Sequence, residues 1–438
     1  MSNARKEAVN ALLKIETDGG YSNIVVDKLL ENSALESKDR AFCTTLIYGA
    51  LERKITLRYV ISKYSKTPVK KLKPFISAVL ETALYQMIYM DKIPDSAAVN
   101  EAVKLVKKSK FSSLSGFVNA VLRAFLRDGK KIVYPDNKVE YLSVKYSVIK
   151  DIARLFLSQY GDEAEDVLAG FFTLCGTSLK VNTLKISVEE LKSELSKSCE
   201  VSAHPIVNDV LVVKGAGSVR SLYGYNDGLF HIQDAASAIC AKIVDAKQGE
   251  RVLDVCAAPG GKSFSIAENM GDDGEVLALD LYPHKVELIK KGAERLGLKS
   301  IKSFVNDAGV YNPDLGKFNK VLCDLPCSGL GILGKKPEIR YKNVAFVDNL
   351  EVLQYHLLQS SKLYVEVGGI LFFSTCTLNE KENFGVVKKF LSENDDFIPF
   401  EIGQGIKKSR KDMINTLTLF PHIHKTDGFF ISAFKRVK

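Results

Sequence analysis

The chain has 438 residues, of which 46% are hydrophobic and 26% are charged, and a formal net charge of +9, which is typical of a globular protein of about three domains. No uncharged apolar stretch reaches the ~18 residues of a membrane span, and residues 1–16 carry charges throughout, so we expect no membrane anchor and no secretory signal. Eight cysteines without a CxxC pair argue against a zinc site and a disulfide framework, and predict a cytoplasmic protein without bound metal.

Residues 1–130 are predicted to be helical throughout. Apolar residues recur at helical spacing over residues 99–106, and Asp95 and Ser96 just before them are candidate helix caps. A second amphipathic helix is expected over residues 116–123. Three runs here resemble the NusB-like RNA-binding fold, which implies an RNA-binding helical domain. These runs are Ile93-Pro94, Ala98-Val99-Asn100-Glu101-Ala102-Val103 and Phe117-Val118-Asn119-Ala120-Val121-Leu122-Arg123.

The positive charge is concentrated in this first third of the chain. Residues 1–131 hold 23 basic and 13 acidic side chains, whereas the remaining residues hold 38 and 39. Seven basic residues and no acidic residue lie between Lys54 and Leu80. Because neutralised phosphates supply most non-specific nucleic-acid affinity, this distribution favours a nucleic-acid partner. The alternative is a solvated basic surface without a partner.

Two further domains are predicted after residue 130. Residues 131–228 mix helix and strand signals, with short strands expected at 179–181 and 209–213, and predict a small α/β connecting domain. Over residues 229–438 strands and helices alternate, which is typical of a doubly wound sheet. The expected strands of that sheet are residues 251–255, 275–279, 301–305, 320–323, 370–373 and 429–434.

A glycine-rich loop follows the first strand of the predicted sheet. Its residues are Cys256, Ala257, Ala258, Pro259, Gly260, Gly261 and Lys262. The two glycines permit a tight turn and the close approach of a ligand, and the start of the next helix suits an anionic group. Asp280 ends the second strand, where an acid accepts hydrogen bonds from ribose hydroxyls. Asp307 follows the third strand and is placed to meet the amine of adenine. GxGxxG spacing is missing, so a nicotinamide dehydrogenase is a distant rival.

Two cysteines follow predicted buried strands. Cys327 lies in Asp324-Leu325-Pro326-Cys327, after the strand at 320–323, and Cys376 lies in Ser374-Thr375-Cys376, after the strand at 370–373. In an open α/β sheet, reactive groups lie at the carboxyl ends of the strands. One free cysteine packs like a small hydrophobic residue. Two thiols beside a nucleotide loop instead indicate covalent chemistry on a substrate.

The glycine-rich loop and both cysteine motifs together resemble the RNA 5-methylcytosine methyltransferases. With the NusB-like segment in front, the resemblance covers nearly the whole chain, and its form is the Sun/Fmu (RsmB-type) 16S rRNA (cytosine-5)-methyltransferases of the RsmB/NOP family. It implies a multidomain protein whose last domain is a Rossmann-like class I methyltransferase with a mostly parallel seven-stranded sheet. It also implies S-adenosylmethionine as cofactor and one cytosine of bacterial 16S rRNA as target. We expect a monomer.

The resemblance also implies residue roles. Carbon 5 of cytosine is a poor nucleophile until a thiolate adds to carbon 6, and Cys376 is the implied nucleophile. Cys327 would assist release of the product, and Asp324 would hydrogen-bond the base and help bind the cofactor along with residues 256–262, Asp280 and Asp307. In DNA cytosine methyltransferases the thiol after proline attacks instead, and this reversed assignment makes Cys327 the nucleophile.

Some features depart from the family pattern. Leu325 stands where the family commonly has alanine, and Gly334 stands where an arginine is frequent. One alternative function is cytosine-5 methylation of tRNA or of another rRNA. A second is an RNA-binding assembly or antitermination factor with a non-catalytic methyltransferase domain. The intact glycine loop and the two thiols argue against that second alternative.

Overall fold

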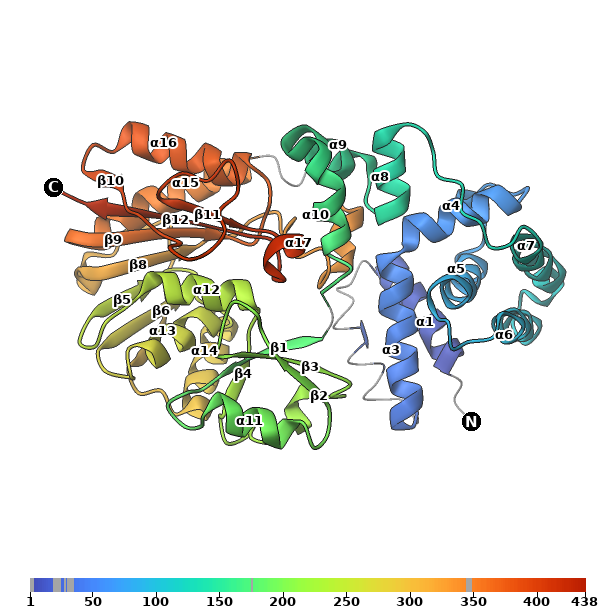
Figure 1. Cartoon of the computed structure of the whole chain (residues 1–438), viewed down its shortest axis with the longest axis horizontal. Helices are drawn as coiled ribbons and strands as arrows, with labels where there is room; N and C mark the ends of the chain where they lie inside the picture. Colours follow the sequence, from blue (N-terminus) through green and yellow to red (C-terminus); the bar gives the residue numbers. More distant parts are fainter. Residues whose placement is uncertain (1–3, 19–24, 27–28, 30–34, 175, 344–348) are drawn as a thin grey trace. The chain divides into compact units, whose positions relative to one another are not determined.

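The computed structural model describes residues 4–18, 25–26, 29, 35–174, 176–343 and 349–438 (Figure 1). The chain forms two compact units. The first consists of residues 1–165 and 333–344, and the second of residues 166–332 and 345–438. The division into three domains at residues 130 and 228 stays a prediction. None of the helices in the described ranges is long and apolar enough to cross a membrane.

The first unit is built from helices. They are α1 (Ala4–Asp18), α3 (Ser37–Glu52), α4 (Lys54–Tyr64), α5 (Pro74–Tyr89), α6 (Asp95–Lys107), α7 (Ser115–Arg127), α8 (Lys138–Tyr146) and α9 (Lys150–Tyr160). Short 3-10 turns follow α4, α6 and α9: η1 (Val69–Lys71), η2 (Ser112–Leu114) and η3 (Gly161–Glu163). The turn η6 (Pro337–Tyr341) also belongs to this unit, although it follows β8 in the chain. Helix α5 is buried on nearly all sides from Ile76 to Met87, as expected for a helix that is apolar all round. It is therefore the centre of this unit's core.

Helices α6 and α7 confirm the two amphipathic helices expected near residues 99–106 and 116–123. The predicted caps of α6 are wrong. Pro94 is the residue before the first helical turn, and no side chain caps that turn. Asp95 cannot be the cap because it is already the first residue of the helix, and its side chain forms an ion pair with Lys130 at 3.1 Å.

The second unit begins with a small antiparallel sheet. Helix α10 (Ala164–Gly170) runs into it from the first unit. Its strands are β1 (Thr177–Val181), β2 (Glu200–Ala203), β3 (Val210–Lys214) and β4 (Phe230–Ile232), in the order β2-β3-β1-β4. Helix α11 (Val188–Leu195) begins with a capping box of Ser187 and Glu190 and buries Leu191 and Leu195 against this sheet. The strands expected at 179–181 and 209–213 are β1 and β3. Strands β2 and β4 were not predicted, because they are too short for an alternation of apolar and polar residues to be recognised.

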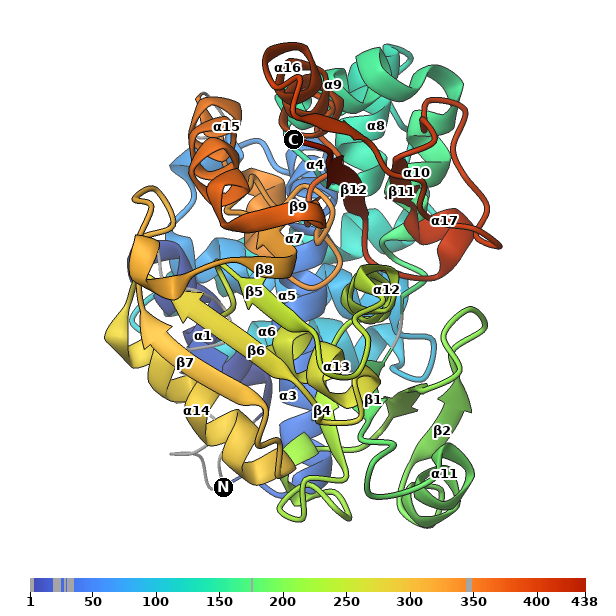
Figure 2. The same cartoon turned by 90° about the vertical axis from the view of Figure 1, so that its left-hand side faces the viewer.

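The large sheet of the second unit has the predicted doubly wound form. Its strands are β5 (Arg251–Asp254), β6 (Glu275–Asp280), β7 (Ile301–Val305), β8 (Phe318–Asp324), β9 (Val365–Thr375), β10 (Phe397–Pro399), β11 (Thr416–Leu419) and β12 (Phe429–Arg436). Seven strands follow the order β10-β12-β9-β8-β5-β6-β7, and β11 pairs with β12 as an eighth. Pairs among β5 to β9 are parallel, whereas β12 is antiparallel to β9. Figure 2 shows β5, β6 and β7 side by side.

Helices cover both faces of this large sheet. They are α12 (Ala235–Val244), α13 (Gly261–Asn269), α14 (Pro283–Leu296), α15 (Leu350–Ser361) and α16 (Val386–Glu393); the short α17 (Pro421–His424) follows β11. Side chains of α12, α13 and α14 pack with Val252 and Leu322 on one face, and those of α15 and α16 pack with Leu253 and Val321 on the other. Successive strand residues therefore enter opposite cores, as strand geometry requires.

Candidate active site at the sheet edge

The order of the large sheet reverses at β5, which is flanked by β6 on one side and β8 on the other. Ligands of such sheets bind outside the carboxyl ends of the strands at this reversal. Here β5 ends at Asp254 and β8 ends at Asp324. A cavity of about 210 Å³ opens at this edge. It is lined by Ile232, Gln233, Asp234, Ser237, Asp254, Cys256, Ala257, Ala258, Pro259, Gly261, Lys262 and Asp324.

The cavity brings together most of the residues predicted to bind a cofactor. Residues 256–259, Gly261, Lys262 and Asp324 line it, whereas Gly260, Asp280 and Asp307 do not. Asp280 is buried at the end of β6, and its Oδ1 accepts the Tyr282 N–H at 3.2 Å. Asp307 is exposed, and its Oδ1 accepts the Gly309 N–H at 2.8 Å. The roles of these residues remain proposals.

Gly260 makes the turn from β5 into α13 possible. Its φ is +110°, a backbone conformation that L side chains rarely adopt. A Cβ atom at this position would lie 2.3 Å from Cζ of Phe264, so the space is closed as well. Helix α13 then begins at Gly261, on the wall of the cavity, and the N–H groups of its first turn have no partner within the helix.

Lys262 and Asp324 form an ion pair at the base of the cavity. The Lys262 Nζ lies 2.7 Å from Oδ2 of Asp324, and the Ser374 hydroxyl donates to the other carboxylate oxygen at 2.8 Å. Burial alone would lower the pKa of Lys262, but the Asp324 carboxylate raises it above its ordinary value. Lys262 therefore stays an ammonium group, and its charge holds the Asp324 carboxylate in place.

Asp254 is a site residue that the sequence reasoning missed. It is buried on the cavity wall at the end of β5, and the Ser263 hydroxyl donates to its Oδ2 at 2.7 Å. Burial raises the pKa of Asp254 to about 7, and the nearby Asp324 adds to the rise, while the Ser263 hydrogen bond opposes it. The strand-end rule that selected Asp280 applies equally to Asp254, so this residue could have been found.

The two predicted thiols meet at the same edge. Sγ of Cys327 lies 3.2 Å from Sγ of Cys376. Strands β8 and β9 are parallel neighbours with Asp324 opposite Ser374, so each strand delivers a cysteine just beyond its end. Neither thiol lines the cavity itself. Asp324, which precedes Cys327 by three residues in the sequence, does line it.

Several contacts connect the loops that carry these cysteines. The Leu325 N–H donates to the Ser374 carbonyl at 3.0 Å, and the Gly331 N–H donates to the Cys376 carbonyl at 3.0 Å. The hydroxyls of Ser328 and Thr377 lie 2.7 Å apart. Main-chain and side-chain hydrogen bonds therefore connect the two loops before and after the cysteines.

The hydrogen bond to Cys376 is the largest influence on Cys327. Together with burial, it raises the pKa of the Cys327 thiol well above its ordinary value. The Cys327 thiol is therefore hard to ionise, and either sulfur of the pair can donate the hydrogen bond. Burial raises the pKa of the buried Cys323 and Cys240 thiols to about 12 each.

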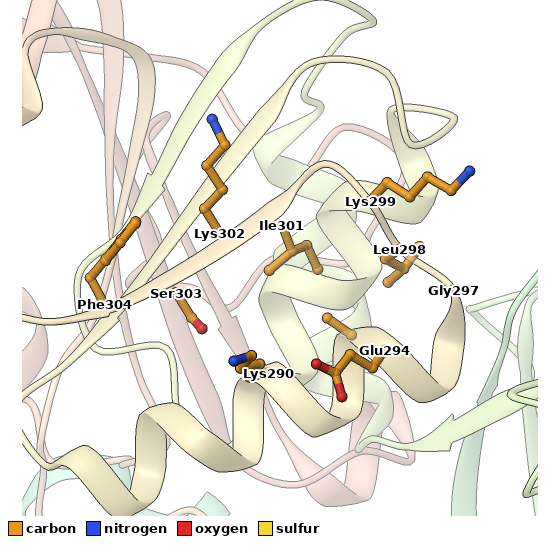
Figure 3. A pocket seen from close by; sticks show the side chains of 10 residues that line it. Lys290, Glu294, Gly297, Leu298, Lys299, Ile301, Lys302, Ser303 and Phe304 are labelled. Atoms are coloured by element: carbon orange, nitrogen blue, oxygen red, sulfur yellow. The ribbon is translucent and has the colours of Figure 1, made fainter.

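A larger cavity of about 560 Å³ lies elsewhere, between α14 and β7 (Figure 3). Figure 3 shows Lys290 and Glu294 on the helix below Ile301 and Ser303 on the strand. The residues that line this cavity include none of the predicted site residues. It reaches back to the loop before β7, which is the amino end of that strand. We therefore place the candidate site at the smaller cavity. Across the described residues, no group of three or more His, Cys, Asp or Glu side chains is arranged to hold a metal ion.

Comparison with known proteins shows the family of this chain. Residues 241–435 match a family described as 16S rRNA methyltransferase RsmB/F. The chain is 33% identical over 99% of both lengths to a probable ribosomal RNA small subunit methyltransferase B of Bacillus subtilis, and 35% identical over 100% of both lengths to a protein of the same name from Synechocystis. The chain belongs to the RsmB/F family. The resemblance to RsmB-type methyltransferases is thereby confirmed.

Two further comparisons confirm the fold of this RsmB/F-family protein. Residues 2–127 match the NusB family, which agrees with the helical domain predicted at the start of the chain. The crystal structure of a protein named PH0851 superposes with a TM-score of 0.82 and 25% identity, over 100% of this chain and 99% of that one. The predicted combination of a NusB-like helical domain and a mostly parallel α/β methyltransferase domain is confirmed.

Proposed function

We propose that this protein transfers a methyl group from S-adenosylmethionine to carbon 5 of a cytosine in small-subunit rRNA. The observation that carries the proposal is the 3.2 Å approach of the Cys327 and Cys376 sulfurs beside the acid-lined cavity. A single thiol would serve many reactions. A pair at the carboxyl edge of a class I methyltransferase sheet suits a reaction that forms and then breaks a bond to sulfur. The names of the two relatives support an rRNA substrate.

The residues around the cavity fit S-adenosylmethionine, which is a cation at its sulfur and at its amino group. Asp254 and Asp324 place two carboxyl groups on the cavity wall, and Asp324 is the one that the Lys262 ion pair marks as charged. The free N–H groups at the start of α13 suit the cofactor's carboxylate. Asp280 and Asp307, at the ends of β6 and β7, are the proposed partners of the ribose and the adenine. When bound, the cofactor supplies an electrophilic methyl group.

The thiols have different roles in this proposal. The Cys376 sulfur, as a thiolate after its proton passes to solvent, adds to carbon 6 of cytosine, and the electron pair of the 5,6 double bond becomes available at carbon 5 to take up the methyl group. A base, either water or a side chain at the site, then takes the proton from carbon 5. The double bond re-forms, and the bond between carbon 6 and sulfur breaks with its electron pair returning to the sulfur. The hydrogen bond to Cys376 and burial raise the pKa of the Cys327 thiol, which disfavours its thiolate and favours Cys376 as the nucleophile. Cys327 assists the release step.

Asp324 orients the base in this proposal. Its carboxylate is held by Lys262 and Ser374, so its position is fixed before the substrate binds. The target base has to leave its stack, which costs a few kcal/mol in general. The excess of basic residues in the first unit would supply contacts to RNA phosphates.

Methyl transfer to purified small-subunit rRNA, followed by bisulfite mapping, tests this function. We expect one cytosine of 16S rRNA to become resistant to bisulfite when the protein and S-adenosylmethionine are added together. Parallel reactions with tRNA and with large-subunit rRNA distinguish the other RNA substrates. Transfer of labelled methyl without any resistant cytosine would contradict the carbon 5 assignment.

A further inference from the structure

Glu382 is a fully buried carboxylate that the sequence reasoning passed over. It lies in η9 (Lys381–Gly385), a single π-helical turn that precedes α16. A charge buried in this way is costly unless hydrogen bonds compensate it. Three donors do so. The Ser328 N–H and the Gln354 side-chain amide donate to Oε2 at 2.8 and 3.1 Å, and the Asn379 side-chain amide donates to Oε1 at 2.9 Å.

These three donors belong to the segments that carry the thiols. Ser328 directly follows Cys327, and Gln354 also donates to the carbonyl of Pro326, the residue before Cys327, at 2.9 Å. Asn379 lies three residues after Cys376, and its own N–H donates to Thr377. One carboxylate therefore holds the main chain on both sides of Cys327 and the loop of Cys376.

We propose that Glu382 is a positioning residue that sets the separation of the Cys327 and Cys376 thiols. This inference rests on the proposed function, because the separation matters only if both thiols act. Glu382 does not line the cavity, so it acts through the two loops. Its negative charge also contributes to the raised pKa of Cys327, after the Cys376 hydrogen bond and burial. The carboxylate thus helps to keep Cys327 protonated while Cys376 reacts.

The variant Glu382→Gln tests the proposal with little change in volume. Glutamine offers one acceptor and one donor group, so it cannot satisfy all three donors. We expect kcat to fall by about ten- to a hundredfold, the range for losing a hydrogen bond to a charged group. The KM for S-adenosylmethionine should stay unchanged. Glu393→Gln is the matched control, because Glu393 is exposed on α16 and also accepts a side-chain hydrogen bond.

A second substitution keeps the proposal falsifiable if Glu382→Gln is poorly folded. In the double variant Glu382→Gln/Asn379→Asp, the glutamine amide can donate to the new carboxylate while its oxygen still accepts from Ser328 and Gln354. We expect this pair to regain most of the lost kcat, and Asn379→Asp alone to be impaired. A folded Glu382→Gln protein with the kcat of the wild type would overturn the proposal.

Alkylation of Cys327 gives a readout that does not depend on methyl transfer. The groups that face this thiol are Cys376 and Glu382. Reaction of the full chain with iodoacetamide, followed by peptide mass spectrometry across a pH series, should show a lower pH midpoint for Cys327 in Glu382→Gln than in the wild type. An unchanged midpoint would overturn the proposal. A lowered midpoint in a protein that never methylates RNA would reject the proposed function and keep the role of Glu382.

Discussion

At the scale of single residues, some side chains of the site can be predicted from their position at the ends of strands, whereas others cannot be predicted from the sequence. Asp324 ends a buried strand, and Cys327 and Cys376 each lie just beyond one, where the reactive groups of such sheets lie. Glu382 lies eight residues beyond Ser374, inside a helical turn. Nothing in its local sequence shows that its carboxylate turns back toward Cys327, because that contact depends on how two loops pack.

Replacing each of the two cysteines should block the reaction at a different step. Cys376→Ala removes the proposed nucleophile, so we expect no methyl transfer and no covalent complex. Cys327→Ala leaves the nucleophile but impairs release, so a protein–RNA adduct that survives denaturing electrophoresis should accumulate. The opposite pattern, an adduct in Cys376→Ala only, would support the reversed assignment of the thiols.

Asp254 should make stability depend on pH. The unfolded carboxyl ionises near pH 4, but the folded one ionises at about pH 7 because it is buried. Its stabilising contribution is therefore full below pH ~4 and is lost as the pH rises through 7. We expect Asp254→Asn to gain stability over the wild type between pH 5 and pH 8 by on the order of 2 kcal/mol. Urea unfolding at the two pH values measures this gain, and a constant difference would contradict the burial argument.

At the scale of elements, the strands of the large sheet were predictable because short apolar runs alternate with helical segments. Strands β5 to β9 and β12 lie where the sequence indicated. Strands β10 and β11 were missed, since they have three and four residues and add to the antiparallel edge. The close contact of the loop after Cys327 with the chain before β12 could not be predicted from the sequence either. Its sign in the sequence is Gly331, where a side chain would not fit.

Gly331 should tolerate no side chain. A Cβ atom there would lie 1.9 Å from the Gly428 carbonyl oxygen and 2.7 Å from the Cys376 carbonyl oxygen, so main chain would have to move. We expect Gly331→Ala to lower the free energy of unfolding by about 1–3 kcal/mol and to slow turnover. Gly116→Ala is the control, because a Cβ atom on that helix meets nothing within 4 Å. Equal stability of the two variants would show that the loop can shift.

At the scale of the whole molecule, one short segment lies between two stretches of the second unit in the sequence but belongs to the first unit in the structure. Residues 333–344 follow the Cys327 loop in the chain but belong to the first unit. The Arg340 guanidinium is fully buried there and donates to the carbonyls of Tyr146 and Leu333 at 2.8 and 3.1 Å. Burial lowers the pKa of Arg340 to about 10. The sequence predicts this segment within the last domain, residues 229–438, so its place in the first unit is a finding of the structure.

The basic first unit should govern RNA affinity. Lys70 and Lys71 are exposed next to α5 in a region without acidic residues. If each contacts a phosphate, Lys70→Gln/Lys71→Gln should flatten the dependence of log Kd on log salt by about 1–2. Fluorescence anisotropy with the full chain measures this slope. Lys192→Gln/Lys197→Gln, which removes the same charge from the second unit, should change it less.

The sequence by itself determined the order of the elements, the glycine turn at Gly260 and the two cysteine motifs, because each depends on residues that are neighbours in the chain. Only the tertiary structure decided that the Cys327 and Cys376 sulfurs lie 3.2 Å apart and that Glu382 holds both loops. The physical reason is the parallel pairing of β8 and β9. It aligns residues 50 positions apart, and this register follows from the packing of both sheet faces.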